Sequence, residues 1–315
     1  MTGETNKRKA KIAVVGSINM DLVVTTAKSP VPGETILGES FSMIPGGKGA
    51  NQAVAAARLG AEVSMIGCVG GDLFGGKMIE QLRNEGIDTS HVRVEQEATT
   101  GVALIQVLGD GDNSIVVVPG ANALVTVGQV EEAEAKIGSA DVLLVQLEIP
   151  FPAVEAALRI ARRHGVRTIL NPAPAQKLPA ELLELVDVLT PNETEAAILA
   201  HGTVEGAGSL EDRMTVLQDI AGHASLLITV GEKGVRTAIG GARATYPAYK
   251  VDVVDTTAAG DSFNAGVAVR WGEGAELAEA VRFASKVGAL TVTRFGAQSS
   301  LPTREQVESF AGAEA

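Results

Sequence analysis

The stretch VLLVQLEIPFPAVEAALRIARRHGVRTIL, residues Val142–Leu170, decides the fold class. It opens with an almost wholly apolar run at Val142–Gln146, continues into a segment of helical period at Pro152–Arg163, and closes with a second short β-rich run at Arg167–Leu170. Apolar strands that alternate with helices are typical of βαβ units, in which parallel strands are covered on both faces. This stretch therefore predicts a parallel α/β core.

The same alternation extends on both sides of this unit. Further short β-rich runs lie at Lys11–Val15, Val63–Val69, Val186–Leu189 and Leu226–Val230. Further segments of helical period lie at Ala50–Leu59, Phe74–Asn84, Gln129–Ile137, Glu193–Leu199, Leu210–Ala221, Gly260–Trp271, Leu277–Thr293 and Arg304–Phe310. The sequence predicts a three-layer α/β/α domain with a mostly parallel central sheet.

Two stretches contain strands without helices between them. Leu22–Met43 is punctuated by glycine and proline, and Gly101–Val118 reads as a β-hairpin around Gly109–Asn113. Antiparallel strands inserted into a parallel scaffold predict a small β lid from residues of about 22–43 and 101–118. We expect residues 1–10, which are polar and basic, to form a flexible tail, and residues 11–315 to form one domain.

Composition excludes several classes of function. The 315 residues carry a formal net charge of −12, which repels nucleic acids and anionic membranes, so we expect neither as a partner. No window approaches the roughly 18 uncharged apolar residues of a membrane span. Cys68 is the single cysteine, which excludes a disulfide within the chain, and the four histidines are scattered, so a zinc site is not expected. We expect a cytoplasmic protein.

One glycine-rich segment only imitates a phosphate-binding loop. GDLFGGK, at Gly71–Lys77, has the GxxxxGK spacing and follows an apolar run. The next residue is Met78, where such a loop needs Ser or Thr to hold Mg²⁺. We interpret this segment as an ordinary turn from strand to helix.

Polar residues recur where predicted strands end. Asn19 and Asp21 follow the first strand in GSINMD, while Glu148 and Asn171 follow two later ones. Ligands of open α/β sheets bind beyond the carboxyl ends of the strands, and an aspartate there can accept hydrogen bonds from sugar hydroxyls. An Asn/Asp turn is the alternative for any one of these residues, but it explains the recurrence less well.

Two glycine-rich turns precede predicted helices. In PGGKGANQ, Pro45–Gln52, glycines allow close backbone approach, and Lys48 and Asn51 supply polar groups. In DTTAAGDSFN, Asp255–Asn264, small residues leave backbone N–H groups uncovered at a helix start, an arrangement suited to an anion. Asp261 lies in that first turn and can accept a proton from an attacking hydroxyl. Helix capping is the alternative for both segments.

Asn192 and Glu195, in PNETE, share a face at another helix start. A carboxylate and an amide there suit the hydrated Mg²⁺ of a nucleotide. The alternative is the ordinary preference for Glu in first helical turns.

Together these segments resemble the ribokinase family, the phosphofructokinase-B-type carbohydrate kinases. Gly46–Asn51 and the segment DTTAAGDSFNAG from Asp255 match the two family signatures, and GSINMD, NPAPA, LTPNETEA and VTRFGAQSSLP match in order. The resemblance covers about Lys11 to Phe310 and implies a ribokinase-like domain with a β lid.

The resemblance also implies roles for individual residues. Asp261 would be the general base, with Ala258, Ala259 and Gly260 as the anion hole. The sugar would be held by Asn19, Asp21, Gly47, Lys48, Asn51 and Glu148, with Asp261 at its reacting hydroxyl. Mg²⁺ and the nucleotide would be held by Asn192, Glu195, Thr229, Gly231, Gly234, Gly260 and Ser285. A potassium site would be formed by Asp255, Thr257, Thr291, Arg294, Gly296 and Ser300, partly through backbone carbonyls.

The implied activity is transfer of a phosphoryl group from ATP to O5 of D-ribose, giving D-ribose 5-phosphate, with Mg²⁺ and an activating K⁺. A homodimer that pairs the two lids is also implied. Kinases of 2-deoxyribose, fructose or adenosine are the alternatives within the enzyme class. A sugar sensor without catalytic activity is the alternative outside it, and Asp261 with its preceding AAG segment argues against it.

Overall fold

The computed structural model describes residues 8–109, 113–204 and 208–314, and a nine-stranded sheet divides them into layers. Its strands are β1 (Lys11–Val15), β4 (Glu62–Gly70), β5 (Asp88–Glu95), β8 (Val142–Gln146), β9 (Arg167–Asn171), β10 (Val188–Leu189), β11 (Ser225–Thr229), β12 (Val235–Ile239) and β13 (Ala242–Tyr246). Their order is β13-β12-β11-β10-β9-β8-β1-β4-β5. The pairs from β11 to β5 are parallel, whereas β12 and β13 are antiparallel.

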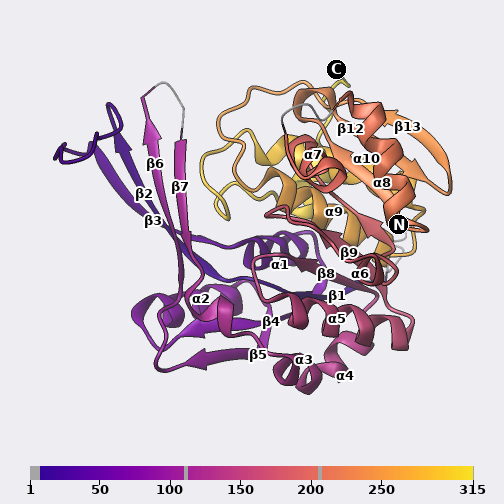
Figure 1. Cartoon of the computed structure of the whole chain (residues 1–315), viewed down its shortest axis with the longest axis horizontal. Helices are drawn as coiled ribbons and strands as arrows, with labels where there is room; N and C mark the ends of the chain where they lie inside the picture. The colour runs from indigo at the N-terminus through magenta and orange to yellow at the C-terminus, as the bar shows by residue number, and fades with distance from the viewer. Residues whose placement is uncertain (1–7, 110–112, 205–207, 315) are drawn as a thin grey trace, which may run out of the picture.

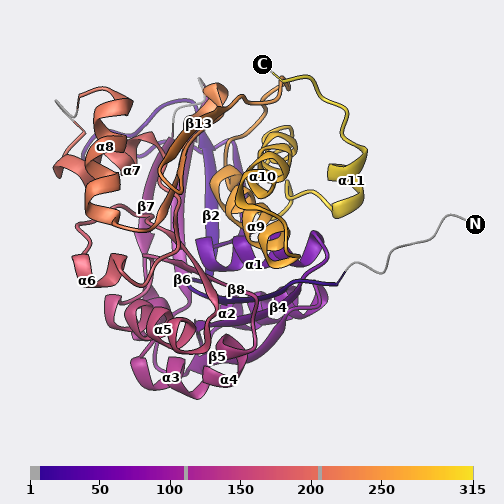
Figure 2. The ribbon, with the colours of Figure 1, turned by 90° about the vertical axis from the view of Figure 1, so that its right-hand side faces the viewer.

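Helices cover both faces of this sheet. One face carries α1 (Lys48–Arg58), α2 (Leu73–Asn84), α9 (Ala259–Gly272), α10 (Leu277–Thr291) and α11 (Arg304–Ser309). The other carries α3 (Val127–Glu132), α4 (Glu134–Gly138), α5 (Phe151–His164), α6 (Ala180–Leu183), α7 (Glu193–His201) and α8 (Leu210–Ala221). Figure 2 shows α9, α10 and α11 on one side of the molecule and α6 and α8 on the other.

Successive strand residues supply two separate cores. Val14 and Leu144 face the first helical layer, whereas Ala13 and Leu143 face the second, and all four are fully buried. Burying such a side chain stabilises the fold by roughly 1.5–3 kcal/mol for valine or leucine, which is why these strands read as continuous apolar runs. The predicted three-layer α/β/α architecture is confirmed.

A second sheet projects from this body as the lid (Figure 1). It consists of β2 (Asn19–Thr26), β3 (Ser40–Gly46), β6 (Gly101–Leu108) and β7 (Asn113–Val118), in the order β3-β2-β6-β7. The outer pairs are antiparallel, and the central pair of β2 and β6 is parallel. The predicted hairpin is therefore present as β6 and β7, while residues 110–112 of its predicted turn lie outside the described residues.

Several elements differ from the sequence prediction. The helix expected over Gln129–Ile137 is two short helices, α3 and α4, that meet at Ala133. The lid begins at Asn19, before Leu22, because β2 pairs along its whole length with both β3 and β6. The elements β5, β12, β13 and α6 were not predicted, and β3 ends at Gly46, three residues beyond the predicted Met43. The other predicted elements agree to within two residues at each end.

The polar sequence of β5, DTSHVRVE, and the exposed residues of β13 explain why these two strands were missed. Both lie at the edges of the sheet, where strands bury little and lose the apolar signature of a central strand.

The predicted tail over residues 1–10 is only partly described. Residues 1–7 lie outside the described residues, Arg8 pairs with Asp141, and Ala10 is buried in the first core. Within the described ranges, no helix is both long enough and apolar enough to cross a membrane.

Candidate active site

Two adjoining cavities lie where the carboxyl ends of the central strands meet the N-termini of α1 and α9. The smaller cavity, of about 190 Å³, is lined by Lys48, Asn171, Glu195 and Asp261, among others. The larger cavity, of about 800 Å³, is lined by residues of α7, η2 (Gly231–Lys233), α9 and α10. Both cavities are lined by Asn192, Thr229, Thr256, Ala259 and Gly260. The larger cavity therefore adjoins the site around Asp261.

Asp261 is held by two amides from the start of α1. Nδ2 of Asn51 donates to its Oδ2 at 2.9 Å, and Nε2 of Gln52 donates to its Oδ1 at 3.1 Å. Burial and Glu148 raise the pKa of Asp261, against the opposing effects of Lys48 and the two amides. A buried carboxylate with a raised pKa at a helix start is suited to accept a proton from a bound hydroxyl.

Lys48 lies among several carboxylates. Burial disfavours its charged form, but Asp261, Glu148, Glu195 and Asp21 together raise the pKa of Lys48 above its usual value. Burial, Glu148 and Asp261 raise the pKa of Asp21 to about 7. The site therefore carries more negative than positive charge.

Glu148 and Glu195 are each held at a helix start. The backbone N–H of Lys48 donates to Oε2 of Glu148 at 3.2 Å, and the hydroxyl of Ser17 donates to the same oxygen. Glu195 accepts from the backbone N–H of Asn192 at 2.8 Å in a capping box at the start of α7. Burial raises the pKa of Glu195, and Asp261 adds to this effect.

The base of the lid brings Asn19 and Asp21 beside α1. Oδ1 of Asn19 accepts from Nδ2 of Asn122 at 2.6 Å. A Cβ at Gly46 would lie 2.2 Å from Oδ2 of Asp21, so only glycine leaves room for this carboxylate. Gly47 has a φ of 88° and passes close to the backbone of Asn19, where a Cβ would lie 2.6 Å from the amide nitrogen.

The start of α9 exposes backbone to both cavities. Ala258 adopts a φ of 59°, a left-handed conformation that costs a non-glycine residue roughly 1–2 kcal/mol. This conformation turns the chain so that Ala259 and Gly260 begin the helix beside Asp261. A Cβ at Gly260 would meet nothing within 4 Å, so open space, rather than packing, lies over this residue. The N–H of Ala259 donates to the carbonyl of Thr256 at 3.2 Å. Uncovered N–H groups at a helix N-terminus are suited to bind an anion.

The predicted nucleotide residues line the larger cavity. Thr229, Gly231 and Gly234 border it from the end of β11 and from η2, and Ser285 borders it from α10. The hydroxyl of Ser285 donates to the carbonyl of Val281 at 3.0 Å.

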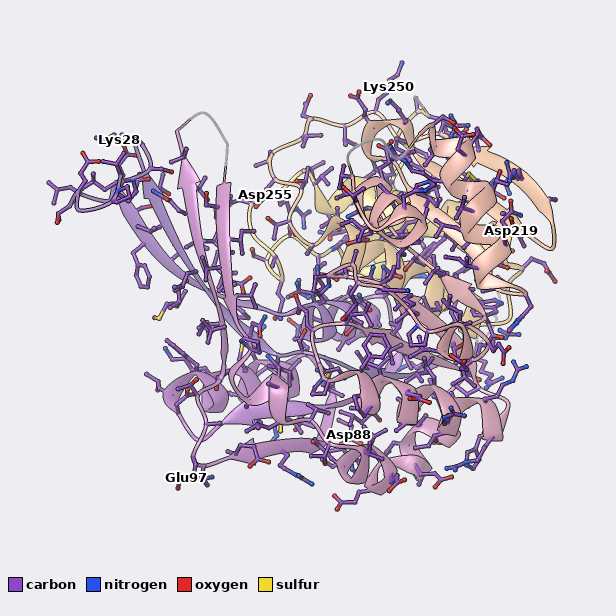
Figure 3. All side chains as sticks on the ribbon, viewed as in Figure 1. Lys28, Asp88, Glu97, Asp219, Lys250 and Asp255 are labelled. Carbon is purple, nitrogen blue, oxygen red and sulfur yellow. The ribbon has the colours of Figure 1, made fainter. Side chains whose placement is uncertain are left out.

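The predicted potassium residues lie on two neighbouring loops and on α10. Asp255 accepts from the backbone N–H groups of Thr257, at 2.9 Å, and Gly296, at 2.8 Å, and so joins the loops. Burial opposes the charge on Asp255, but these hydrogen bonds hold its pKa below the usual value. Figure 3 shows Asp255 on the side of the body that faces the lid.

The other members of this set have partners within the protein. The hydroxyl of Thr291 donates to Oγ of Ser262 at 2.9 Å, and the hydroxyl of Ser300 donates to the carbonyl of Ala297 at 2.8 Å. The guanidinium of Arg294 donates to Gln306 at 3.4 Å. Across the part of the chain that the structure describes, no group of three or more His, Cys, Asp or Glu residues has the arrangement of a metal site.

In the turn at Gly71–Lys77, the side chain of Asp72 occupies the position where a phosphate would bind in a phosphate-binding loop. Oδ1 of Asp72 accepts from the backbone N–H of Gly75 at 2.8 Å, and its Oδ2 accepts from that of Thr100 at 2.8 Å. A carboxylate thus occupies the start of α2, and the interpretation as a strand-to-helix turn is confirmed.

Sequence reasoning missed three polar residues of the site. Gln52 holds Asp261, Asn122 holds Asn19, and Thr256 lines both cavities. The only signal for Gln52 was an amide directly before the apolar run AVAAA, in a helix whose neighbouring positions are buried. Nothing in the sequence indicated that Asn122, more than a hundred residues away, would contact Asn19.

The three-layer fold and a buried acid at a helix start beside two adjoining cavities are the arrangement expected of a small-molecule kinase. Residues 9–304 match the family described as pfkB family carbohydrate kinase, and the chain belongs to that family. A ribokinase of Haemophilus influenzae is 45% identical over 299 residues, which cover 95% of this chain and 97% of that protein.

Two further comparisons concern substrates. A solved structure of an Arabidopsis thaliana ribokinase complexed with ribose and ATP is 32% identical, with a TM-score of 0.85, and the match covers 96% of this chain and 100% of that one. A deoxyribokinase of Salmonella typhimurium is 35% identical over 300 residues, which cover 95% of this chain and 98% of that protein.

Proposed function

We propose that the chain catalyses ATP-dependent phosphorylation of D-ribose at O5, giving D-ribose 5-phosphate. The observation that carries this proposal is the position of Asp261, which lines the smaller cavity beside Ala259 and Gly260, two residues that both cavities share. A sugar at the base of the lid, beside Lys48 and Asp261, and a nucleotide in the larger cavity would meet at this carboxylate. The identities to ribokinases support the choice of ribose and ATP.

The sugar would be held by Asn19, Asp21, Gly47, Lys48, Asn51 and Glu148. Among the described residues, Oδ1 of Asn51 is buried without a hydrogen-bond partner. A buried acceptor left unpaired costs roughly 1–3 kcal/mol, and a sugar hydroxyl would remove this cost by donating to it. The carboxylate of Asp21 would accept from a second hydroxyl.

The nucleotide would occupy the larger cavity against Thr229, Gly231, Gly234 and Ser285. Its volume of about 800 Å³ lies within the usual range for ligand pockets. Gly260 itself lines this cavity, so the terminal phosphate would lie at the start of α9.

Asn192 and Glu195 would organise Mg²⁺, largely through water. Both line the smaller cavity, and their oxygens are ligands that Mg²⁺ prefers. Because carboxylates outnumber Lys48 here, an incoming polyphosphate meets net negative charge, which a divalent cation offsets. When bound, Mg²⁺ supplies this compensation at the phosphate oxygens.

Asp255, Thr257, Thr291, Arg294, Gly296 and Ser300 would form the activating potassium site. Carboxylate, hydroxyl and backbone carbonyl oxygens suit a hard monovalent cation. Asp255 lies between the two loops, so a cation bound there would stabilise the loop that leads into the anion hole at Ala258.

The chain's own residues would then perform the transfer in one step. Asp261 accepts the proton of the attacking hydroxyl as that oxygen bonds to the transferred phosphorus. The N–H groups of Ala258, Ala259 and Gly260 stabilise the charge on the transferred group, and ADP leaves. Closure of the lid over the sugar excludes water and suppresses hydrolysis of ATP.

Replacement of Asp261 by asparagine tests the proposal directly. We expect Asp261→Asn to lower kcat by at least 10²-fold, the usual scale for general-base catalysis, with ribose affinity nearly unchanged. Coupled release of ADP measures kcat, and calorimetry measures ribose binding. Asp219→Asn is the matched control, because Asp219 is exposed on α8 (Figure 3). Near-normal turnover of Asp261→Asn would contradict the assignment.

A kinase of 2-deoxyribose is the second candidate, and the similarity to a deoxyribokinase favours keeping it. Asn19 and Asp21 together favour a sugar with both secondary hydroxyls. The same assay with ribose, 2-deoxyribose, fructose and adenosine, with and without potassium, separates these substrates. Absence of ADP release with every sugar would instead support a sensor.

A homodimer would form through the lids. Met43, Leu22, Leu104 and Val116 are successive partners across the four lid strands, so they form one apolar row on one face. Val116 is 60% exposed, and Leu104 is 46% exposed. Pairing of two such faces would remove this apolar surface from water.

A further inference from the structure

Asp261 is joined to the interior of the protein by a chain of amides. Nε2 of Gln52 donates to Oδ1 of Asp261 at 3.1 Å and to Oδ1 of Asn171 at 3.2 Å. Nε2 of Gln146 donates to Oε1 of Gln52 at 2.6 Å. Gln52 and Gln146 are both fully buried. Gln52 has no exposed surface, whereas Asn51 and Asp21 retain 5% and 8%, so Gln52 reaches a ligand only through Asp261.

We propose that Gln52, supported by Gln146, is a positioning residue that fixes the carboxylate of Asp261 for proton transfer. This inference rests on the proposed function of Asp261 as the general base. In this inference Gln52 holds Oδ1 of Asp261 from the interior of the protein. Oδ2 of Asp261 remains beside Asn51, on the side proposed for the sugar.

The hydrogen bonds determine which way the amide of Gln52 faces. In the reverse orientation its oxygen would face the carboxylate of Asp261 and the oxygen of Asn171, and its NH₂ group would face that of Gln146. All three contacts would then be repulsive. Asp261 and Asn171, whose Nδ2 donates to the carbonyl of Thr190, therefore fix the NH₂ group of Gln52 toward the carboxylate. The donor of Gln146 stabilises this orientation, which favours the ionised carboxylate.

Packing alone does not account for Gln146. Its Oε1 has no hydrogen-bond partner among the described residues, and a Cβ at Gly16 would lie 2.0 Å from this oxygen. A leucine would fill similar space without an unpaired oxygen, which costs roughly 1–3 kcal/mol. The donor that Gln146 provides to Gln52 gives a reason for an amide at this position.

The charges around Asp261 explain why the base needs such a donor. Burial and Glu148 raise the pKa of Asp261, while Lys48, Asn51 and Gln52 lower it. Asp21 and Glu195 are the other charged groups coupled to Asp261. Loss of the Gln52 donor would raise the pKa of Asp261 further, and the base would be protonated over a wider pH range.

The test replaces Gln52 by methionine, which has nearly the same shape but no donor. We expect kcat of Gln52→Met to fall about tenfold to a hundredfold, the loss typical of a hydrogen bond to a charged group. In the pH profile of kcat, the acid limb, which is the fall in kcat at low pH, should move to higher pH by about one unit. The KM for ribose should change less than about threefold. Saturating ribose keeps the titration of free Asp21 out of this profile.

Gln129→Met is the matched control. Gln129 is also buried, and its Nε2 donates to the carbonyls of Gly67, at 2.6 Å, and His91, at 3.2 Å, away from the cavities. We expect this variant to lose stability with an unchanged acid limb. Gln52→Met leaves the donor of Gln146 without its acceptor. The double variant Gln52→Met/Gln146→Met removes this donor too, so it should be more stable than Gln52→Met while its acid limb stays shifted.

The outcomes separate this inference from the proposed function. If the wild type is active and Gln52→Met has the same acid limb as the wild type, the positioning role is overturned and the proposed function is not. If Gln52→Met does not fold, Gln146→Met replaces it, with an upward shift expected and an unmoved limb contrary to the inference. A wild type that releases no ADP with any sugar overturns the proposed function and, with it, this inference.

Discussion

At the scale of single residues, the site brings together several carboxylates that do not contribute to packing of the core. Asp21, Glu148, Glu195 and Asp261 surround one lysine, Lys48, in a largely buried space. Asp21, Glu195 and Asp261 have lost solvation, and neighbouring carboxylates add repulsion. Such a cluster lowers stability in exchange for groups that can bind hydroxyls and accept a proton.

Asp21→Asn should therefore stabilise the ligand-free protein at alkaline pH. The pKa of Asp21 rises from 3.8 unfolded to about 7 folded, so the folded chain retains a proton that the unfolded chain has lost. The unfolding free energy consequently falls as pH rises through this window. At pH 8 the variant should gain up to about 4 kcal/mol, at ~1.4 kcal/mol per pH unit.

Denaturant unfolding at pH 8 and at pH 4 measures this difference, which should shrink toward zero at the lower pH. Ribose affinity should fall at the same time, since the variant loses a hydroxyl acceptor. An equal gain at both pH values would contradict the charge explanation.

At the scale of elements, helix α9 depends on one unusual backbone conformation. Ala258 is the single non-glycine residue with positive φ in the described ranges, and it lies directly before the helix that carries Asp261. Strained backbone of this kind persists where surrounding contacts hold it, and it is common at functional sites. Here it positions the N–H groups of the proposed anion hole.

Substitutions at Ala258 should separate strain from function. Ala258→Gly removes the strain, so its stability should stay within about 1 kcal/mol of wild type. Ala258→Val adds a β-branched side chain in a left-handed conformation and should cost about 1–3 kcal/mol and lower kcat more than it raises KM for ribose. Thermal unfolding and ADP release measure both effects.

Ala135→Val, at an exposed helical position, controls for the substitution itself. Normal kcat in Ala258→Val would show that the backbone at this residue does not serve catalysis.

At the scale of the whole molecule, the lid is the part with least support from the body. It projects from the α/β/α layers (Figure 1), and its apolar row lies on the face opposite Asp21, because neighbouring residues of β2 point to opposite faces. A second lid packed on this face would hold the first in place over the sugar.

Val116→Asp should dissociate the proposed dimer. A charge within the apolar row would have to be buried without a partner, which opposes association. Analytical ultracentrifugation should show a dimeric wild type and a monomeric variant. Val127→Asp is the control, because Val127 is partly exposed at the start of α3, outside the lid, and should leave the dimer intact. A monomeric wild type would contradict lid pairing.

The sequence by itself determined the class of fold and indicated where the candidate site lies. Continuous apolar runs such as Val142–Gln146 have one stable environment, a central strand covered on both faces, so local pattern was sufficient. Glycine-rich segments at Gly46–Asn51 and Asp255–Asp261 were recognisable because close backbone approach restricts residue type. Their predicted side chains Lys48, Asn51 and Asp261 do lie together.

Only the tertiary structure decided what depends on contacts between distant segments. The edge strands β5 and β13 bury too few side chains to show an apolar pattern in the sequence. Strand β2 begins at Asn19, before the predicted Leu22, because it pairs with β3 on one side and β6 on the other. Gln52 reads locally as one polar residue in an alanine-rich helix. Its contact with Asp261 spans more than two hundred residues, and such a contact exists only when the sheet brings α1 and α9 together.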